Sequence, residues 1–123
     1  MTSRSLSHAS DMRSRIAAAI RSIPRGRVST YGAVAKGAGY PGAARQAVAT
    51  LRLTMGLPWH RVVGAGGHIK TRGDDAIEQR LRLEAEGVRF RGRHVDMANF
   101  EFQFPSRSKK KSKRTPKSKA KRS

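Results

Sequence analysis

The sequence contains no cysteine among its 123 residues. Disulfide bonds, thiolate metal ligands and a thiol nucleophile are therefore all excluded. The four histidines, His8, His60, His68 and His94, lie 52, 8 and 26 residues apart. They lack the i, i+4 pairing with acidic neighbours that a zinc-binding helix shows. We assign no metal and no cofactor.

Long hydrophobic runs are also absent. No stretch approaches the roughly 18 uncharged apolar residues that indicate a membrane span, and no charged-then-apolar leader begins the chain. We expect a soluble intracellular protein without membrane contact, cytoplasmic in a bacterium or nuclear in a eukaryote. Its length allows one domain of modest size. We expect it to act as a monomer.

Acidic residues are few, since 8 Asp and Glu stand against 27 Lys and Arg, and the formal net charge is +19. Ten of the cations lie in residues 105–123, which contain no acid and no large apolar side chain. Residues 1–104 therefore keep only +9 of the +19. Because such a segment cannot bury apolar surface, we predict that 105–123 is a disordered arm that binds polyanions without reading sequence. The alternative is a solubilising or targeting tail.

Apolar periodicity predicts three helices in the first half of the chain, after a flexible N-terminus over residues 1–9. Ser10 is a candidate N-cap for the first, whose apolar positions are Met12, Ile16, Ile20 and Ile23 and whose end is marked by Pro24 and Gly26. Ser29-Thr30 is a candidate cap for a second helix, which Gly39 ends. Pro41 fits the first turn of a third helix, with Ala44, Ala47, Val48 and Leu51 on one face and Gly56-Leu57-Pro58 as the exit. Two short helices around a tight turn at 39–41 predict a helix-turn-helix.

The second half of the domain is predicted to mix short strands with one helix. Residues 61–63 and 68–70 flank a glycine-rich turn, which predicts a small β-hairpin. Asp74 or Asp75 begins a helix with Glu78 three residues beyond Asp75 in capping-box spacing, with Ile77, Leu81 and Ala85 on one face and Gly87 at its end. Residues 88–90 and the alternating Phe100, Phe102 and Phe104 predict extended segments. The fold class is mainly α: a winged-helix-like helix-turn-helix domain over 10–104 with a small hairpin, followed by the basic tail.

The third helix carries unusually small residues for a segment that reads DNA. PGAARQAVATL offers mainly glycine and alanine around Arg45 and Gln46. A helix with ordinary side chains is ~10 to 12 Å across, whereas the minor groove is ~6 Å wide. A face stripped to small residues can press into a widened minor groove. The alternative is that the alanines are good helix formers packing closely on a neighbour, and the pattern does not separate the two.

Four segments follow one another along the chain, in the order VSTYGAVAKGAGYPGAARQAV, LPWHRVV, GGHIKTRG and LEAEGV. From about Ile16 to Val88 the chain resembles the DNA-binding domain of the O6-alkylguanine-DNA alkyltransferases, and specifically the alkyltransferase-like proteins. In the true alkyltransferases the second segment contains Pro-Cys-His-Arg, and the cysteine accepts the alkyl group from the damaged base. Trp59 stands at that position here. The alkyltransferase-like proteins are defined by this replacement.

The resemblance implies a non-enzymatic sensor of O6-alkylguanine in duplex DNA. The O6 atom is enclosed by pairing and stacking, so inspecting it requires the base to leave the duplex, at a cost of a few kcal/mol that is smaller for a poorly paired lesion. Arg45 matches the family's finger, which enters the duplex where the nucleotide has left. Trp59 is then a wall of the pocket that receives the base, and its indole offers a π-face to the alkyl group. The implied partners are the damaged duplex and nucleotide excision repair proteins.

The resemblance also assigns roles to the neighbours of these two residues. Tyr31 matches a tyrosine that crowds the 3′ phosphate, and its alternative role is that of a core aromatic. His60 has no thiol to activate and is expected to be structural, while Arg72 matches an arginine near the flipped base. The predicted lesion pocket comprises Tyr31, Pro58, Trp59, His60, Arg61 and Arg72. The predicted DNA-binding residues are Thr30, Tyr31, Gly42, Ala43, Ala44, Arg45, Gln46 and Ala47.

Two other functions are weighed against this one. A repair enzyme would need His60 or Trp59 to accept the alkyl group, and neither replaces a thiolate near neutral pH. A basic helix-turn-helix architectural or regulatory protein without lesion preference would suit the cationic tail. Equal affinity for damaged and undamaged duplexes would favour that second alternative.

Overall fold

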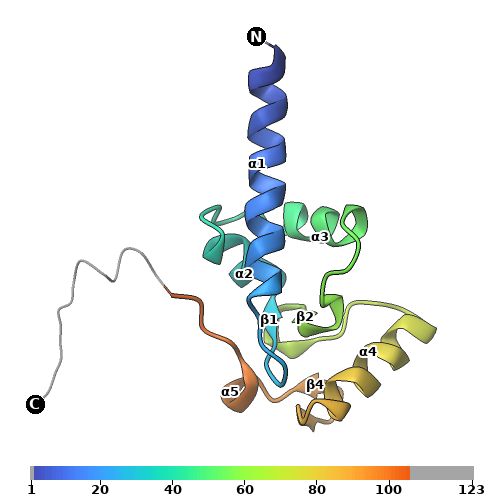
Figure 1. The fold of residues 1–123 in the computed structure, drawn as a ribbon. Helices are drawn as coiled ribbons and strands as arrows, with labels where there is room; N and C mark the ends of the chain where they lie inside the picture. Colours follow the sequence, from blue (N-terminus) through green and yellow to red (C-terminus); the bar gives the residue numbers. More distant parts are fainter. Residues whose placement is uncertain (1, 106–123) are drawn as a thin grey trace, which may run out of the picture.

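The computed structural model describes the backbone of residues 2–105 and the side chains of residues 11–105. The predicted basic tail therefore lies, apart from Pro105, outside the described residues. Helices dominate, as predicted, and the strands are two residues long (Figure 1). The helices are α1 (Thr2–Arg21), α2 (Tyr31–Gly37), α3 (Ala44–Leu53), α4 (Asp74–Ala85) and α5 (Met97–Phe100). The strands are β1 (Ser29–Thr30), β2 (Val62–Val63), β3 (Phe90–Arg91) and β4 (His94–Val95), and two 3-10 turns are η1 (Trp59–Arg61) and η2 (Ala65–Gly67). Within the described residues, no helix combines the length and the apolar character needed to cross a membrane.

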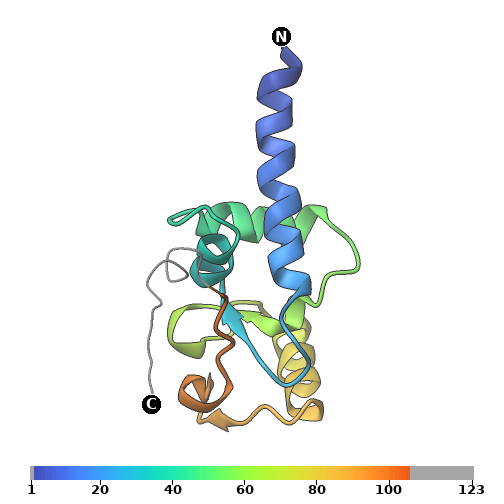
Figure 2. The ribbon, with the colours of Figure 1, turned by 60° about the vertical axis from the view of Figure 1, so that its left-hand side comes forward.

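Helix α1 is longer than predicted. It begins at Thr2 rather than after Ser10, so residues 2–9, expected to be a flexible N-terminus, are its first turns. Its N-terminal half projects from the body of the molecule (Figures 1 and 2). The predicted apolar stripe is confirmed in the other half, because Ile16 and Ile20 are fully buried. These isoleucines anchor α1 on the first core cluster.

Helices α2 and α3 lie against each other and against the buried half of α1. The predicted cap of α2 is confirmed, since the Thr30 hydroxyl accepts a hydrogen bond of 3.1 Å from the Ala33 amide. Gly39 follows the helix with φ +98°, a conformation that favours glycine. Pro41 is not in the first turn of α3 as predicted, because it lies in the turn that precedes Ala43, the N-cap residue.

The predicted hairpin over residues 61–70 is wrong. Strand β2 pairs in parallel with β1, Ser29 opposite Val62 and Thr30 opposite Val63. The glycine-rich segment after β2 forms η2 and is closed by a 2.7 Å hydrogen bond from the Gly64 amide to the His68 carbonyl. The antiparallel pair is instead β3 with β4, farther along the chain.

The apolar face predicted for α4 is exposed in the structure. Ile77 and Leu81 are 61% and 60% exposed, whereas Gln79 and Leu83 are fully buried. The predicted capping box is also absent: Gly73 is the N-cap residue, and Glu78 pairs with Arg82 along the helix. Leu83 belongs to a second core cluster with four buried valines, Val28, Val63, Val88 and Val95. The end of the helix agrees with prediction, since Gly87 follows with φ +92°.

The last described residues pack against Val28 and against the first core cluster. Phe100 ends α5 rather than lying in an extended segment. Beyond it the chain is extended, as predicted, and the Phe102 amide donates to the Val28 carbonyl at 2.7 Å. The rings of Phe102 and Phe104 meet edge to face at 4.8 Å. A Cβ on Gly37 would lie 2.6 Å from the Phe104 ring, so this glycine lets the aromatic pair close over α2.

Candidate nucleic-acid interface and base pocket

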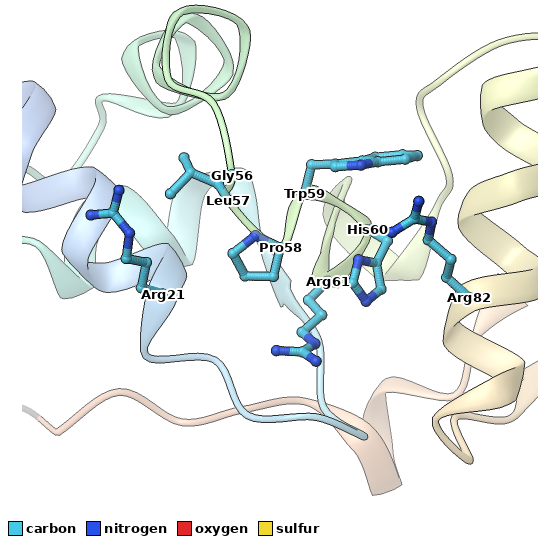
Figure 3. A pocket seen from close by; sticks show the side chains of 8 residues that line it. All are labelled: Arg21, Gly56, Leu57, Pro58, Trp59, His60, Arg61 and Arg82. Atoms are coloured by element: carbon cyan, nitrogen blue, oxygen red, sulfur yellow. The ribbon is translucent and has the colours of Figure 1, made fainter.

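The turn η1 carries a pocket of about 560 Å³ between the end of α1 and the face of α4 (Figure 3). Four of the six predicted pocket residues line it: Pro58, Trp59, His60 and Arg61. Tyr31 and Arg72 do not. Arg21, Gly56, Leu57 and Arg82 complete the lining. The predicted motif therefore forms one wall of a pocket, and two arginines that the sequence analysis did not select stand on either side of it.

The indole of Trp59 is half-buried and extends across this pocket toward α4 (Figure 3). Its ring meets His60 edge to face, with centroids 6.3 Å apart, and the Arg82 guanidinium lies 5.8 Å from its centroid. The backbone amide of Trp59 donates to the Leu57 carbonyl at 2.7 Å, which fixes the turn. Trp59 belongs to neither core cluster of the described residues. Its ring is therefore available to a ligand.

A buried carboxylate, Glu86, holds the two residues that follow Trp59. Its Oε2 contacts Nε2 of His60 at 2.8 Å and accepts a hydrogen bond of 2.8 Å from Nη2 of Arg61. Its Oε1 accepts from Nε of Arg61 at 3.0 Å and from the Gly26 amide at 3.1 Å. Burial alone would raise the pKa of Glu86, but the hydrogen bonds from Arg61, His60 and Gly26 outweigh it and lower the pKa from 4.5 to about 2. Glu86 is therefore an anion at neutral pH, and it fixes η1 against the end of α4.

Glu86 was not among the predicted site residues, although it lies in the LEAEGV segment that contributed to the resemblance. In the sequence, nothing in its residue type distinguishes Glu86 from Glu78 and Glu84 of α4, each of which forms an exposed ion pair with an arginine four residues away. The available signal was its place just before the helix-ending Gly87. An acid at that place has no favourable interaction with the helix dipole, so it calls for a partner elsewhere.

A second brace comes from Gln79 in the middle of α4. Its amide nitrogen donates to the carbonyls of His60 and Val62 at 3.2 and 3.0 Å. Its amide oxygen accepts from the Thr71 hydroxyl at 2.8 Å. His60 is thus held through its backbone as well as its ring. Nδ1 of that ring is buried without a hydrogen-bond partner among the described residues, and the geometry agrees with the structural role expected for His60.

The predicted DNA-binding residues of α3 divide into two groups. Gly42, Arg45 and Gln46 are exposed, and Ala43 and Ala44 are half-buried. Ala47, predicted to face the groove, is fully buried in the first core cluster. It cannot contact DNA there, because the face that carries it packs against the rest of the domain. The exposed face of α3 continues instead through Ala49 and Arg52.

Tyr31 and Thr30 lie at the start of α2, next to the strand that pairs with the Trp59 segment. Tyr31 is half-buried and packs against the first core cluster, and this burial raises the pKa of its hydroxyl. This packing agrees with the alternative role of Tyr31 as a core aromatic, and its predicted contact with the 3′ phosphate stays a prediction. Arg72 is exposed in the segment before α4. Arg21 and Arg82, the two pocket arginines that were not predicted, carry no sequence feature that separates them from the other arginines.

Known proteins resemble this chain in sequence and in fold. The family model described as 6-O-methylguanine DNA methyltransferase, DNA binding domain, matches residues 11–88. The chain is 49% identical over 76 residues to the DNA base-flipping protein of Vibrio parahaemolyticus, covering 59% of this chain and 76% of that protein. It is 47% identical over 75 residues to Alkyltransferase-like protein 1 of Schizosaccharomyces pombe, covering 57% and 69% respectively. The crystal structure of S. pombe Atl1 in complex with damaged DNA containing O6-carboxymethylguanine is similar with a TM-score of 0.66 at 29% identity, covering 76% of this chain and 96% of that one.

Proposed function

Because the chain belongs to the family of the 6-O-methylguanine DNA methyltransferase DNA-binding domain, we propose that it is a non-enzymatic sensor of O6-alkylguanine in duplex DNA. The observation that carries this proposal is the position of Trp59. An indole stands where the alkyltransferase motif has its acceptor cysteine, and it lies across a pocket rather than in the core. A half-buried aromatic ring can hold a flipped purine by stacking and apolar contact. It has no nucleophile with which to take the alkyl group.

The neighbours of Trp59 support binding rather than reaction. The full sequence contains no cysteine, and a histidine could replace one as acceptor only with a free ring nitrogen directed at the alkyl carbon. Nε2 of His60 is instead engaged by Glu86 at 2.8 Å, and Nδ1, which has no hydrogen-bond partner among the described residues, is buried and closed to a ligand in the pocket. The retained His60 and Glu86 therefore serve to position η1 in the proposed function.

In the proposed complex, α3 enters the minor groove with its small residues foremost. Gly42 is exposed at the start of this surface and Arg45 projects from the first turn of α3. The planar guanidinium of Arg45 fills the space left by the extruded nucleotide and donates to the orphaned base. Tyr31, at the start of α2, crowds the phosphate beside it. The duplex bends to admit the helix, because an undistorted minor groove is too narrow.

The proposed complex is useful to a cell only if another activity removes the lesion. Nucleotide excision repair acts on distorted duplexes, and a bent duplex with an extruded nucleotide and a bound protein offers such a distortion. We therefore include recruitment of that machinery in the proposal.

The deciding experiment is a competition titration of an O6-methylguanine duplex against its unmodified twin, followed by mass measurement of the protein. We expect a clear preference for the damaged duplex and an unchanged protein mass. Since Trp59 is the only tryptophan, its fluorescence should change as the pocket fills. Equal affinity for both duplexes would favour the architectural alternative, and a mass gain of one methyl group would identify an enzyme.

Arg45→Ala is expected to lower the preference for the damaged duplex about tenfold, equivalent to ~1.4 kcal/mol. With the nucleotide flipped out, Arg45 fills the space that it has left in the duplex. With the nucleotide stacked, Arg45 contacts only a phosphate, so the substitution weakens the complex with the flipped nucleotide more. Arg52→Ala, at the other end of α3, is the matched control and should weaken binding to both duplexes equally. The same competition titration measures both variants. Equal effects of the two substitutions on preference would contradict the role of Arg45.

Deleting residues 105–123 is expected to act in the opposite way. The ten cations of this segment should contribute sequence-independent affinity, with a slope in log K against log salt of about −0.9 for each phosphate neutralised. The truncated protein should bind both duplexes more weakly and with a shallower salt dependence, while its preference for the lesion remains. Titrations at several salt concentrations test this, and loss of the preference itself would place lesion recognition in the tail.

A further inference from the structure

Two large apolar side chains on α4 are exposed and do not line the Trp59 pocket. Ile77 and Leu81 are 61% and 60% exposed, and their i, i+4 spacing places them on the same helix face. The buried face of α4 is complete without them, since Gln79 and Leu83 point into the body. A helix that turns leucine and isoleucine outward while it buries a glutamine has an apolar face that nothing in the fold explains.

A hollow of about 690 Å³ lies beside this pair. Ile69 and Ala76 extend its apolar lining, and His94 borders it from β4. Helix α4 lies at the opposite end of the body from α3 in both views (Figures 1 and 2). The described residues that line the hollow include none from α3 and none that line the Trp59 pocket.

The rim of the hollow is positively charged. Among the described residues, Arg80, Arg93 and one acid, Glu84, line it, and Glu84 is already paired with Arg80 at 3.1 Å. Arg80 is held in place because it also donates to the Gly92 carbonyl at 3.0 Å and lies over the Phe90 ring at 4.3 Å. An occupant of the hollow thus meets apolar side chains, the Arg80–Glu84 pair and, in addition to that pair, the cation Arg93.

We propose that this α4 docking surface, formed by Ile77, Leu81, Arg80 and Arg93, binds an acidic amphipathic helix of a partner protein. Apolar anchors spaced i, i+4 fill a groove of this kind, and a flanking carboxylate complements Arg93, the cation of the lining that Glu84 does not neutralise. A second copy of this chain is disfavoured because each carries a formal charge of +19. The tail at 105–123 lacks the large apolar side chains that the hollow requires. The proposal goes beyond lesion sensing, because docking at α4 requires neither DNA nor an occupied Trp59 pocket.

The test uses a fluorescein-labelled helical peptide with leucines at i, i+3, i+4 and i+7 and glutamates between them. Its binding to the full chain is followed by fluorescence anisotropy at physiological salt, against a scrambled peptide of the same composition and charge. We expect the patterned peptide to bind at least tenfold more tightly than the scramble. Replacing both Ile77 and Leu81 by serine should remove that advantage, and Arg93→Glu should weaken binding about fivefold.

Two matched controls separate this surface from general stickiness or charge. Leu53 and Met55 are exposed to a similar or greater degree elsewhere, so replacing both by serine should leave peptide binding unchanged, and Arg13→Glu controls for Arg93→Glu. The Ile77 and Leu81 double variant should keep the thermal midpoint and DNA affinity of the wild type, so a failure of lesion sensing would not affect the result. The proposal is overturned if the patterned peptide does not bind, if the scramble binds equally, or if the Leu53 and Met55 variant loses as much. Dimerisation of the wild type that Leu81→Ser abolishes would also overturn it, in favour of a second copy.

Discussion

Trp59→Ala is expected to remove most of the discrimination between an O6-alkylguanine duplex and its unmodified twin. A tryptophan side chain contributes a contact area of about 150 to 250 Å², and in the proposed complex this area meets the flipped base alone. Losing it should lower the preference ten- to a hundredfold, or about 1.4 to 3 kcal/mol. General affinity should change little, because the phosphate contacts lie on α3 and in the cationic segments. Competition titration with the two duplexes measures the effect.

The Trp59→Ala substitution should leave the packing of the core unchanged. Trp59 lies outside both core clusters of the described residues, so the alanine variant should unfold at nearly the same denaturant concentration as the wild type. Trp59→Phe keeps an aromatic face and should retain part of the preference. If the alanine variant discriminates as well as the wild type, the pocket beside η1 is not where the lesion is held.

Glu86→Gln is expected to destabilise the fold by about 3 kcal/mol at neutral pH. Removing one partner of a buried ion pair leaves the other charge uncompensated, which typically costs about 3 to 5 kcal/mol. Glutamine keeps the size of the side chain and can still accept from the Gly26 amide, but it leaves Arg61 without its carboxylate. Urea unfolding at pH 7 measures the difference. Glu78→Gln is the matched control, because its pair with Arg82 is half-exposed and contributes at most about 1 kcal/mol.

The same pair predicts how stability depends on pH. Folding lowers the pKa of Glu86 from 4.5 to about 2, so its contribution is fully present above pH 4.5 and is lost as the pH falls toward 2. The shift corresponds to ~3 kcal/mol. The gap in unfolding free energy between wild type and Glu86→Gln should therefore close across this range. A gap that stays constant from pH 5 to pH 2.5 would show that the charge of Glu86 is not what stabilises η1.

Local signals predicted the first half of the fold well. The isoleucine stripe of α1 and the Thr30 cap depend on spacing and side-chain chemistry within a few residues, and both are confirmed. The start of α1 was missed because its first turns continue through Ser10 without a stop signal. The predicted hairpin failed for a different reason: Val62 and Val63 are both buried, which suits a strand covered on two faces, and their partner strand lies more than thirty residues earlier.

The face of α4 could not be predicted from periodicity. Ile77 and Leu81 fit an apolar stripe, and a glutamine is an unlikely core residue by composition. Gln79 is nevertheless buried because the irregular η1–β2 segment presents two carbonyls to it, from His60 and Val62. These two carbonyls come within hydrogen-bond distance of Gln79 only when the η1–β2 segment and α4 are packed together in the fold. The Trp59 motif was found from sequence because its residues are contiguous, whereas Glu86, Arg21 and Arg82 join the site only through the fold.

The short ladder between β1 and β2 joins the entrance of α2 to the Trp59 turn. In the proposed complex this ladder is kept, so Tyr31 and Trp59 hold their separation and the nucleotide must travel the whole way to the indole. The deformation is then confined to the nucleic acid, and the local flexibility of the duplex determines how readily the nucleotide reaches Trp59. Flexible pyrimidine–purine steps and mispaired sites should yield first. In the proposed complex the protein therefore responds first to the deformability of the duplex at each site and only then to the alkyl group on the flipped base.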